Sequence, residues 1–399
     1  MTNNERLAGL LFPDIDKTPD YYENLFPQRN LKEGAKVTRF APSPTGFLHF
    51  GNLFTCVTAY KTAKDSDGVF FVRVEDTDQK RKVDGAIDIM LQGLSVYGVQ
   101  ADEGVVAESK EIGEYGPYYQ SQRKEIYQTY AKALVEQDLA YPCFCSAEEL
   151  DEIRTAQENE STKGYWGKWA KCRNLTIDEI EQKLADGSTF TLRLKSPGSS
   201  EKKCFFDDMI KGKIEMPENV QDIVLLKSDG IPTYHFAHAV DDHLMRTTHV
   251  FRGDEWISST PVHLQLFRVL GFKPPKYAHV APIMKEENGG KRKLSKRKDP
   301  EAAVSYYIEQ GFPQESVNEY IMTIANSNFE DWRRANKTEP IEKFPFSLKK
   351  MSVSGALFDM VKLTDVSKNV ISTMTAQTVY NKTLEWAEQY NKRLAELFK

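Results

Sequence analysis

Hydrophobic and polar positions follow two different periods along the chain. Short runs at 37–40 and 69–74 are rich in Val and Phe, which is typical of buried strands. Between them lies a turn at 42–46 with two prolines and a glycine, followed by apolar residues at helical spacing from Leu53 to Tyr60. Strand, turn, helix and strand in this order predict the start of a βαβ unit.

The rest of the pattern changes character several times. Residues 77–140 carry apolar side chains at helical spacing and are predicted to be helical. Residues 141–222 contain short strand-like runs and four cysteines, which predict a small α+β insertion. Strand signals return at 223–226, and a helix is expected over 260–270, so the βα pattern resumes. The remainder is predicted to be helical.

These changes predict an α/β domain that is split by an insertion and followed by an all-α module. The expected boundaries are an N-terminal extension at 1–36, the first half of the α/β domain at 37–118, the insertion at 119–222, the second half at 223–299 and a helical module at 300–399. The extension is expected to form a surface helix or arm.

Composition narrows the class of protein. The 399 residues include 53 Lys plus Arg against 58 Asp plus Glu, and the net charge of −5 excludes a uniformly basic polyanion binder. The longest apolar runs, such as 68–72, are far shorter than the roughly 20 residues of a membrane span. The start of the chain does not resemble a secretion signal, and five cysteines are too few for a disulfide scaffold. We expect a cytoplasmic protein with reduced thiols and no membrane partner.

The segment 39–51 is the first candidate for chemistry. Its Pro/Gly turn joins a strand to a helix, so backbone N–H groups and the helix dipole can bind phosphate. His49 can donate a hydrogen bond to a phosphate oxygen, and Gly51 can let a flat base approach the backbone. Each residue alone is compatible with an ordinary βα turn, but the combination favours a nucleotide site.

Basic residues are concentrated at 291–298, where six of eight positions are Lys or Arg. A solvated loop and a nuclear localisation patch are the simpler alternatives. The preceding Gly289 and Gly290 favour a mobile loop that closes over a triphosphate.

Acidic residues follow the strand at 69–74. Thr77 or Asp78 could simply cap a helix. The functional alternative is that Glu75 faces the crevice and holds an ammonium group.

Together these segments resemble bacterial-type glutamyl-tRNA synthetases, which are class I aminoacyl-tRNA synthetases. Leu48 to Asn52 is similar to the His-Ile-Gly-His signature, and Lys293 to Arg297 is similar to the Lys-Met-Ser-Lys-Ser loop. The family's Pro-Ser-Pro-Thr-Gly stands at 42–46, where glutaminyl and archaeal relatives typically have Pro-Glu-Pro-Asn-Gly. Further matches lie at 73–78, 232–235, 240–243 and 250–255. The resemblance implies a Rossmann-type catalytic domain with a connective insertion.

The resemblance also implies an activity, substrates and site residues. The expected enzyme is a ligase that uses ATP with Mg²⁺ to activate L-glutamate and charges tRNA-Glu, as a monomer. The implied catalytic residues are His49 and Lys296. The implied ATP-binding residues are His49, Gly51, Lys293, Ser295, Lys296 and Arg297. The implied glutamate-binding residues are Arg39, Ala41, Ser43, Glu75, Tyr234, His238 and Arg252.

Charge supports this assignment, because glutamate and ATP are both anionic. Arg39 and Tyr234 are expected to hold the side-chain carboxylate, and Arg252 is expected to stabilise carboxylate charge. Glutamine in place of glutamate is expected to leave Arg39 unpaired. At His238 the chain departs from relatives that have Asn.

Three cysteines in the insertion have the spacing of a metal site. Some family members hold zinc there with a Cys-x-Cys pair, a third Cys and a Tyr or His. Cys143, Cys145 and Cys172 match, and Tyr165 is the candidate fourth ligand because Asn174 stands where a His is expected. The alternative is a site that has lost its metal.

Two rival functions are a shortened paralogue that glutamylates a modified tRNA nucleoside and a non-catalytic tRNA-binding relative. The intact Lys293–Lys296 motif and the helical module argue against the first, and His49, Glu75, Arg252 and Lys296 argue against the second. Family members usually extend well beyond residue 399. We therefore expect either a shortened form or a natural form that lacks most of the anticodon-binding domain.

Overall fold

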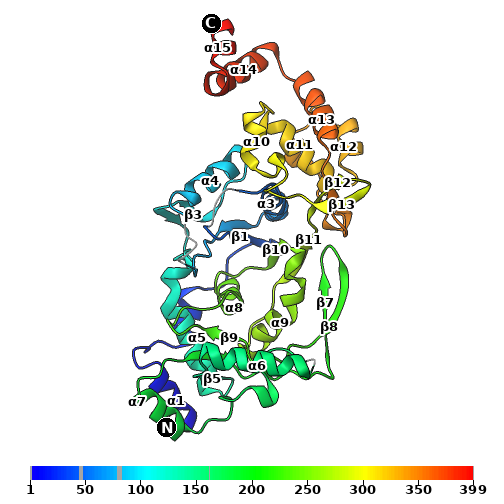
Figure 1. Ribbon diagram of the computed structural model, residues 1–399. Coiled ribbons are helices and arrows are strands. Elements are labelled where there is room, and N and C mark those ends of the chain that lie inside the picture. Colours follow the sequence, from blue (N-terminus) through cyan, green and yellow to red (C-terminus); the bar gives the residue numbers. More distant parts are fainter. Residues whose placement is uncertain (1, 45–47, 79–82, 161, 399) are drawn as a thin grey trace.

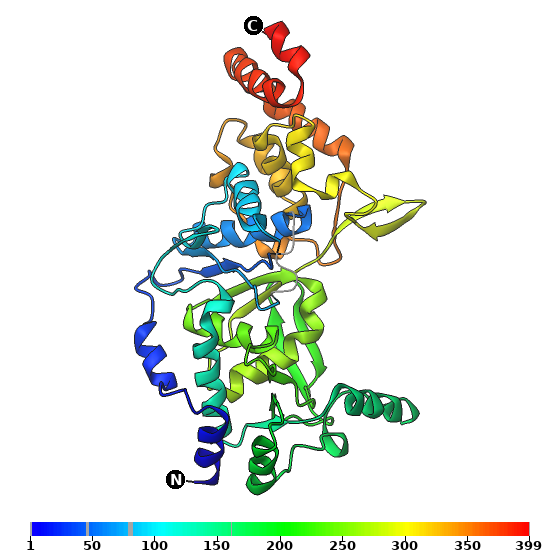
Figure 2. The same cartoon turned by 60° about the vertical axis from the view of Figure 1, so that its left-hand side comes forward.

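The computed structural model describes residues 2–44, 48–78, 83–160 and 162–398. The molecule is elongated, with its two termini at opposite ends (Figure 1), and a rotated view shows the same extended arrangement (Figure 2). The α/β domain occupies the middle, the insertion lies toward the N-terminal end and the last helices form the other end.

The central sheet has the order β1-β2-β3-β4. Its elements are β1 (Val37–Phe40), α3 (Phe50–Lys64), β2 (Val69–Val72), α4 (Ala86–Val96), β3 (Glu103–Ala107) and β4 (Lys110–Ile112). The first three strands are parallel and β4 is antiparallel to β3. This arrangement confirms the predicted α/β fold with a parallel sheet.

A second parallel pair continues the fold next to β1. It consists of β10 (His249–Gly253) and β11 (Lys276–Val280), between which α9 (Thr260–Val269) runs. The backbone N–H of Thr248 donates to Val37 O at 3.0 Å, which ties β10 to β1. The helix α8 (Tyr234–Leu244) leads into β10. Segments on either side of the insertion therefore meet in one core.

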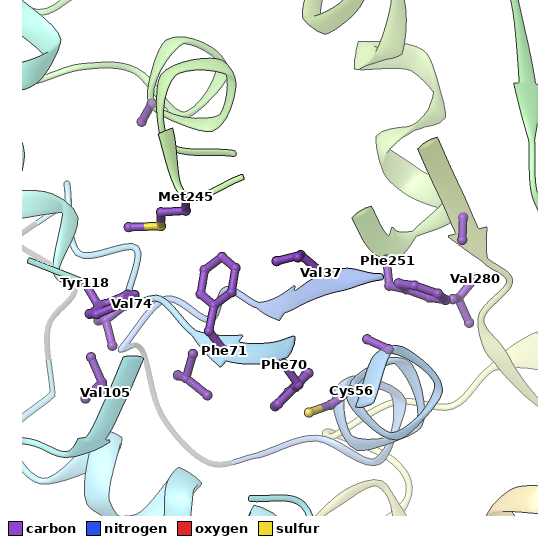
Figure 3. Packing of buried hydrophobic residues seen from close by; sticks show 14 of the residues in the cluster. Val37, Cys56, Phe70, Phe71, Val74, Val105, Tyr118, Met245, Phe251 and Val280 are labelled. Atoms are coloured by element: carbon purple, nitrogen blue, oxygen red, sulfur yellow. The ribbon is translucent and has the colours of Figure 1, made fainter. Parts of the chain in front are cut away.

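Buried side chains fill both faces of the central strands (Figure 3). Phe70 and Phe71 of β2 point to opposite faces, as successive strand residues must. Phe70 lies beside Cys56 of α3, and Phe71 lies on the side of Met245. All four side chains are fully buried or nearly so. Two-sided burial explains why the strand run at 69–72 is apolar without alternation.

The prediction of continuous helix over 77–140 is wrong in its middle. That stretch contains α4, the strands β3 and β4, and α5 (Lys124–Glu136). Gly104 has φ +101°, and a Cβ there would lie 2.1 Å from Val72 O, so only glycine lets β3 approach β2 this closely. Polar residues such as Glu103 and Lys110 hide the strand character of this edge.

The insertion combines antiparallel strands with helices. The strands β5 (Ala140–Cys143), β6 (Thr191–Leu194) and β9 (Val224–Leu226) form one sheet in that order. Helices α6 (Ala147–Asn159) and α7 (Ile177–Ala185) each begin with a capping box. The hairpin of β7 (Lys203–Asp208) and β8 (Gly212–Pro217) contacts β11. The predicted α+β character is thus observed, but the expectation that the βα pattern resumes with the strand signals at 223–226 is wrong, because β9 pairs antiparallel with β6 of the insertion.

The N-terminal extension packs on the rest of the molecule and is more than an exposed arm. It contains α1 (Asn3–Leu11) and α2 (Pro19–Leu25), which contact α5. Tyr22 and Phe26 are 4% and 3% exposed. Arg29 donates to Glu103 at 2.6 and 2.9 Å and to Met245 O at 3.2 and 3.1 Å, which ties the extension to the α/β core.

The C-terminal module is helical as predicted, apart from one short strand. Its helices are α10 (Val304–Glu309), α11 (Gln314–Ala325), α12 (Phe329–Ala335), α13 (Met360–Ser372), α14 (Ala376–Tyr390) and α15 (Lys392–Phe398). The strand β14 (Ala356–Leu357) pairs with β12 (Ile283–Glu287), which also pairs with β13 (Gly290–Lys293). The basic segment is thereby joined to the helical module. No helix in the described ranges is long and apolar enough to cross a membrane.

Candidate active site

His49 caps α3 and presents a defined hydrogen-bond donor. Its Nδ1 accepts from the Gly51 N–H at 3.0 Å, so a neutral imidazole carries its proton on Nε2. Burial, together with the positive charges of Lys296 and Lys293, lowers the pKa of His49 to about 4. At neutral pH the ring is therefore uncharged and can donate through Nε2. A Cβ at residue 51 would lie 3.2 Å from His49 Nδ1, so Gly51 also makes room for the ring.

The basic segment is more structured than a mobile loop. Lys291 to Lys293 belong to β13, and Asn288 and Gly289 form the hairpin turn with positive φ. Leu294 is 2% exposed and anchors the segment in the core. Lys293, Lys296 and Arg297 are exposed. The predicted loop therefore begins as a strand, Gly290–Lys293, and continues as a turn that Leu294 anchors.

Asp299 closes this turn. It accepts hydrogen bonds from Arg292 at 2.6 and 2.8 Å, from the Ser295 N–H at 2.9 Å and from Lys285 at 3.2 Å. These donors hold the pKa of Asp299 well below its usual range, with Arg292 the main cause. Arg292 is thus held by Asp299 and is not offered to a ligand.

A buried charge network lies at the carboxyl ends of β1 and β2. Asp242 of α8 accepts from Arg39 Nε at 3.1 Å and Nη2 at 3.2 Å, and from Arg73 Nη1 at 2.8 Å. Arg39, Arg73 and Asp242 are at most 4% exposed. The two arginines hold the pKa of Asp242 well below its usual range. Arg39 therefore already has a carboxylate partner, and the expectation that glutamine would leave it unpaired is wrong.

The neighbouring Asp241 forms the second half of the network. It accepts from Arg123 Nε, from the Tyr127 hydroxyl and from the Gln120 amide at 2.7, 2.7 and 2.8 Å. These residues received no role from the sequence. A sequence signal for Asp241 was present, because two adjacent aspartates follow the apolar Ala239 and Val240 on a helix.

Arg252 ends β10 and is held by uncharged groups. Its Nε donates to His279 Nε2 at 2.9 Å, Nη1 lies 2.9 Å from His263 Nδ1, and Nη2 donates to Thr260 Oγ1 at 2.9 Å. Nη2 also contacts Trp256 O at 3.4 Å, and the guanidinium lies over the Tyr277 ring at 4.6 Å. Burial lowers the pKa of both histidines. In the described part of the chain, no carboxylate is hydrogen-bonded to this 6% exposed cation.

Tyr234 and His238 line the space between these groups. The two rings are stacked with centroids 5.9 Å apart, and Tyr234 also contacts Trp256 at 4.3 Å. Burial raises the pKa of Tyr234, so its hydroxyl stays protonated as a donor. His238 is fully buried, with Nε2 3.0 Å from the Tyr277 hydroxyl and Nδ1 2.6 Å from Asp242 Oδ2, the second contact without hydrogen-bond geometry. Both nitrogens of His238 thus face protein groups.

The Glu75 backbone is hydrogen-bonded to the turn that follows β1. The Glu75 N–H donates to Pro42 O at 2.9 Å, and the Glu75 carboxylate accepts from Arg73 at 3.1 Å. Burial raises the pKa of Glu75, against the opposing effect of Arg73 and Arg39. Ala41 is half-buried and Ser43 is exposed. Thr45 and Gly46 of the signature lie outside the described residues.

The comparison with known proteins gives the family of this site. A model of "tRNA synthetases class I (E and Q), catalytic domain" matches residues 36–365. The chain is 54% identical over 396 residues to the glutamate–tRNA ligase of Acetivibrio thermocellus, covering 98% of this chain and 72% of that protein. It is 52% identical over 394 residues to the ligase of Clostridium perfringens strain 13, with the same coverage. The chain belongs to the glutamate–tRNA ligase family.

Solved structures of glutamate–tRNA ligases share the fold. The ligase of Elizabethkingia meningosepticum, determined in complex with its amino acid, matches with a TM-score of 0.78 at 32% identity over 89% of this chain and 73% of that chain. The ligase of Elizabethkingia anophelis matches with a TM-score of 0.75 at 31% identity, over 88% and 74%. These matches confirm the class I synthetase architecture and the predicted ligase class.

Within this ligase fold, the predicted residues form two groups. Arg39, Glu75, Tyr234, His238 and Arg252 gather around the buried arginines, as the contacts above show. His49, Lys293 and Lys296 gather at the start of α3, where both lysines affect the pKa of His49.

The cysteine cluster forms a separate, compact centre. The Sγ atoms of Cys143, Cys145 and Cys172 all lie within 4.8 Å of one another. The Tyr165 hydroxyl oxygen lies 3.5 Å from Cys143 Sγ and 3.3 Å from Cys145 Sγ. Hydrogen bonds from Cys172 and Tyr165 lower the pKa of Cys143 to about 4. Three sulfurs lie close enough together to hold one metal ion, and the Tyr165 oxygen lies beside two of them.

Proposed function

We propose that the chain activates L-glutamate with ATP and transfers it to the 3′-terminal adenosine of tRNA-Glu. In the first step an α-carboxylate oxygen of glutamate attacks the α-phosphorus of ATP. The bond from that phosphorus to the bridging oxygen breaks, and pyrophosphate leaves glutamyl-adenylate behind. In the second step the 2′-hydroxyl of the terminal adenosine attacks the carbonyl carbon, loses its proton and displaces AMP.

The observation that carries this proposal is that, among the described residues, no carboxylate is hydrogen-bonded to the buried Arg252. A buried cation without a charged partner is costly, and a carboxylate is the group that its planar fork accepts best. Arg39 and Arg73, by contrast, share Asp242. The side-chain carboxylate of glutamate would therefore supply the missing negative charge beside Arg252. The Tyr234 hydroxyl and Arg39 Nη1, now bonded to Phe251 O at 3.3 Å, would complete its recognition.

The ammonium group of glutamate would bind on the side of Glu75 and Ser43. Glu75 lies beside Arg73 and its burial raises its pKa, so a cationic ligand would favour the ionised carboxylate. His238 would act by positioning Tyr234, on whose ring it stacks, and Tyr277, whose hydroxyl lies 3.0 Å from His238 Nε2. This role replaces the direct contact that Asn makes in some relatives.

The phosphate side of the site would use exposed cations and His49. The neutral His49 would donate through Nε2 to the transferred phosphate, and Lys296 would stabilise charge on the leaving pyrophosphate. Lys293, Ser295 and Arg297 would bind the remaining phosphate oxygens, and Gly51 would lie against the base. Mg²⁺ would accompany ATP and offset part of its charge.

We further propose that Cys143, Cys145, Tyr165 and Cys172 hold a structural zinc ion. Closed four-ligand sites of this kind stabilise a fold and take no part in chemistry. Purified protein is expected to contain about one equivalent of zinc, and Cys145→Ser is expected to lower both zinc content and thermal stability. Cys204→Ser is the control, because Cys204 lies on β7 outside the cluster. Less than a few tenths of an equivalent of zinc would end this proposal.

The test of the main function is a pyrophosphate exchange assay with tRNA-Glu present. Exchange that depends on both ATP and L-glutamate, and formation of glutamyl-tRNA, are expected. The exchange should need glutamate rather than glutamine. Exchange without glutamate dependence, or none at all, would contradict the proposal.

A further inference from the structure

We infer that His279 with Asp208, and His263 with His235, are positioning residues that hold Arg252 for the carboxylate of glutamate. This inference rests on the proposed function, because it concerns the residue that we assign to substrate recognition. None of the four is a predicted site residue. His235 lies within the motif match at 232–235, and the other three lie outside the motif segments.

The His279–Asp208 contacts show which ring nitrogen of His279 carries the proton. A guanidinium can only donate hydrogen bonds, so His279 Nε2, 2.9 Å from Arg252 Nε, must be an acceptor without a proton. The neutral ring then carries its proton on Nδ1, which lies 2.6 Å from Asp208 Oδ2. The same carboxylate oxygen accepts the His279 backbone N–H at 3.1 Å. Asp208 therefore fixes both the tautomer and the orientation of His279.

The His263–His235 pair is arranged in the same way, but His263 accepts through the other ring nitrogen. Arg252 Nη1 lies 2.9 Å from His263 Nδ1, so here Nδ1 is the acceptor and the proton is on Nε2. That Nε2 lies 2.8 Å from His235 Nδ1, which must accept in turn. Arg252 is thus held from two sides by imidazoles of opposite tautomer. Thr260 Oγ1 and Trp256 O receive the remaining Nη2 contacts.

Imidazole suits this task better than carboxylate because it fixes geometry without cancelling charge. Asp242 orients Arg39 but also neutralises it. His279 and His263 orient Arg252 and leave its positive charge for the substrate. Asp208 contacts His279 on the side away from Arg252, so its negative charge is separated from the guanidinium by the imidazole ring. In metal sites a carboxylate often orients a histidine ligand. Here Asp208 orients His279 in the same way, and His279 in turn orients Arg252.

The arrangement requires uncharged rings. Protonation of His279 or His263 would point an N–H at a cation. The groups that face these rings include Asp208, Lys211, His235, His238, Asp242 and Arg252. Burial is the main cause that lowers the pKa of His235, His263 and His279. The two acceptors therefore persist at neutral pH.

Paired amide substitutions test the inference, because Asn places its amide near the Nδ1 position of His and Gln reaches the Nε2 position. At residue 279 the acceptor for Arg252 is Nε2, so His279→Gln should keep the KM for glutamate within about threefold, while His279→Asn should raise it roughly tenfold or more. At residue 263 the acceptor is Nδ1, so the order reverses. His263→Asn should be mild and His263→Gln severe. The KM for ATP should not change in any of the four.

The measurement is glutamate-dependent pyrophosphate exchange by the full chain with tRNA-Glu present, together with urea unfolding of each variant. The reversed order at the two positions supports the inference, because a purely structural role has no reason to prefer Gln at one and Asn at the other. The same order at both positions, unchanged KM values, or unfolding of both variants at either position would overturn it. An unsubstituted chain without glutamate-dependent exchange would instead refute the proposed function beneath it.

Discussion

The two sides of the site hold their positive charges in opposite ways. On the amino-acid side, Arg39, Arg73 and Arg252 are at most 6% exposed and each is fixed by at least two protein groups. On the phosphate side, Lys293, Lys296 and Arg297 are exposed on a segment whose fixed points are Leu294 and Asp299. The arginines are thus buried among protein groups, whereas the three cations that we propose bind phosphate are exposed on an anchored segment.

The difference follows from what each side must distinguish. Glutamate and glutamine differ by one charge in nearly the same shape, so selection needs a desolvated cation at a fixed place. A triphosphate carries several charges, and cations in a high-dielectric setting suffice to attract it. Burying these arginines costs free energy, because each desolvated guanidinium needs hydrogen-bond partners. The Asp241–Asp242 pair supplies charge to Arg39, Arg73 and Arg123, whereas Arg252, which we propose binds the substrate, has no hydrogen-bonded carboxylate among the described residues.

The largest effect is expected from Asp242→Asn, which removes charge from the buried side. Arg39 and Arg73 would lose their shared carboxylate, and breaking a buried pair costs about 3–5 kcal/mol of folding free energy. Urea unfolding measures this loss. Asp151→Asn removes an exposed carboxylate paired with Arg154 and serves as the control, with no measurable change expected. Equal stabilities of the two variants would contradict the picture of a charge network that supports the fold.

The next effect is expected from Lys296→Ala on the phosphate side. Glutamate-dependent pyrophosphate exchange should fall on the order of 10²–10³-fold, as for loss of one donor that stabilises transition-state charge. Glutamate binding and the unfolding midpoint should stay the same, because Lys296 is exposed. Lys298→Ala is the matched control, since Lys298 lies on the same segment 4.0 Å from Glu287. Comparable losses in both variants would show general charge attraction and remove the specific role of Lys296.

A smaller effect is expected from pH. Burial lowers the pKa of His49, His238 and His249 to about 4, while unfolded histidine titrates near 6.5. Between these values the unfolded chain binds protons that the folded chain does not, so stability should fall as the pH drops from about 6.5 to 4. The lowered pKa values of Asp208 and Asp242 act only below their ordinary value of 3.8, outside this window.

Urea midpoints at pH 7.5 and pH 5 measure this slope, and His249→Asn should flatten it. His249 lies on β10 next to Thr248 and is not a predicted site residue. The raised pKa values of Glu75 and Glu319 oppose the trend, but they are two groups against a larger number of histidines with lowered pKa values. Greater stability at pH 5 than at pH 7.5 would contradict the assignment of neutral buried histidines.

Much of this molecule could be predicted from its sequence, because motifs and buried strands leave local signals. The strand at 37–40, the helix after the turn and the strand at 69–72 lie where the apolar pattern predicts them. The hairpin of β3 and β4 could not be predicted, since its edge residues are polar and Gly104 is needed only because of Val72 on another strand.

The partners of the site residues were also beyond reach. Asp242 is separated from Arg39 by 203 residues, and Asp208 from His279 by 71. Only folding brings them together. The motifs therefore predicted candidate site residues such as Arg39, but they gave no signal for the distant partners that hold them, such as Asp242.

The most direct test of the account is the ratio of kcat/KM for glutamate and glutamine in pyrophosphate exchange, measured for the unsubstituted chain and for Arg252→Gln. Loss of a charge-assisted hydrogen bond should reduce the preference for glutamate by roughly 10–100-fold. The substitution keeps a polar side chain and leaves the network around Asp242 in place. A preference for glutamate that survives Arg252→Gln unchanged would contradict the central claim that this buried, unneutralised arginine recognises the substrate carboxylate.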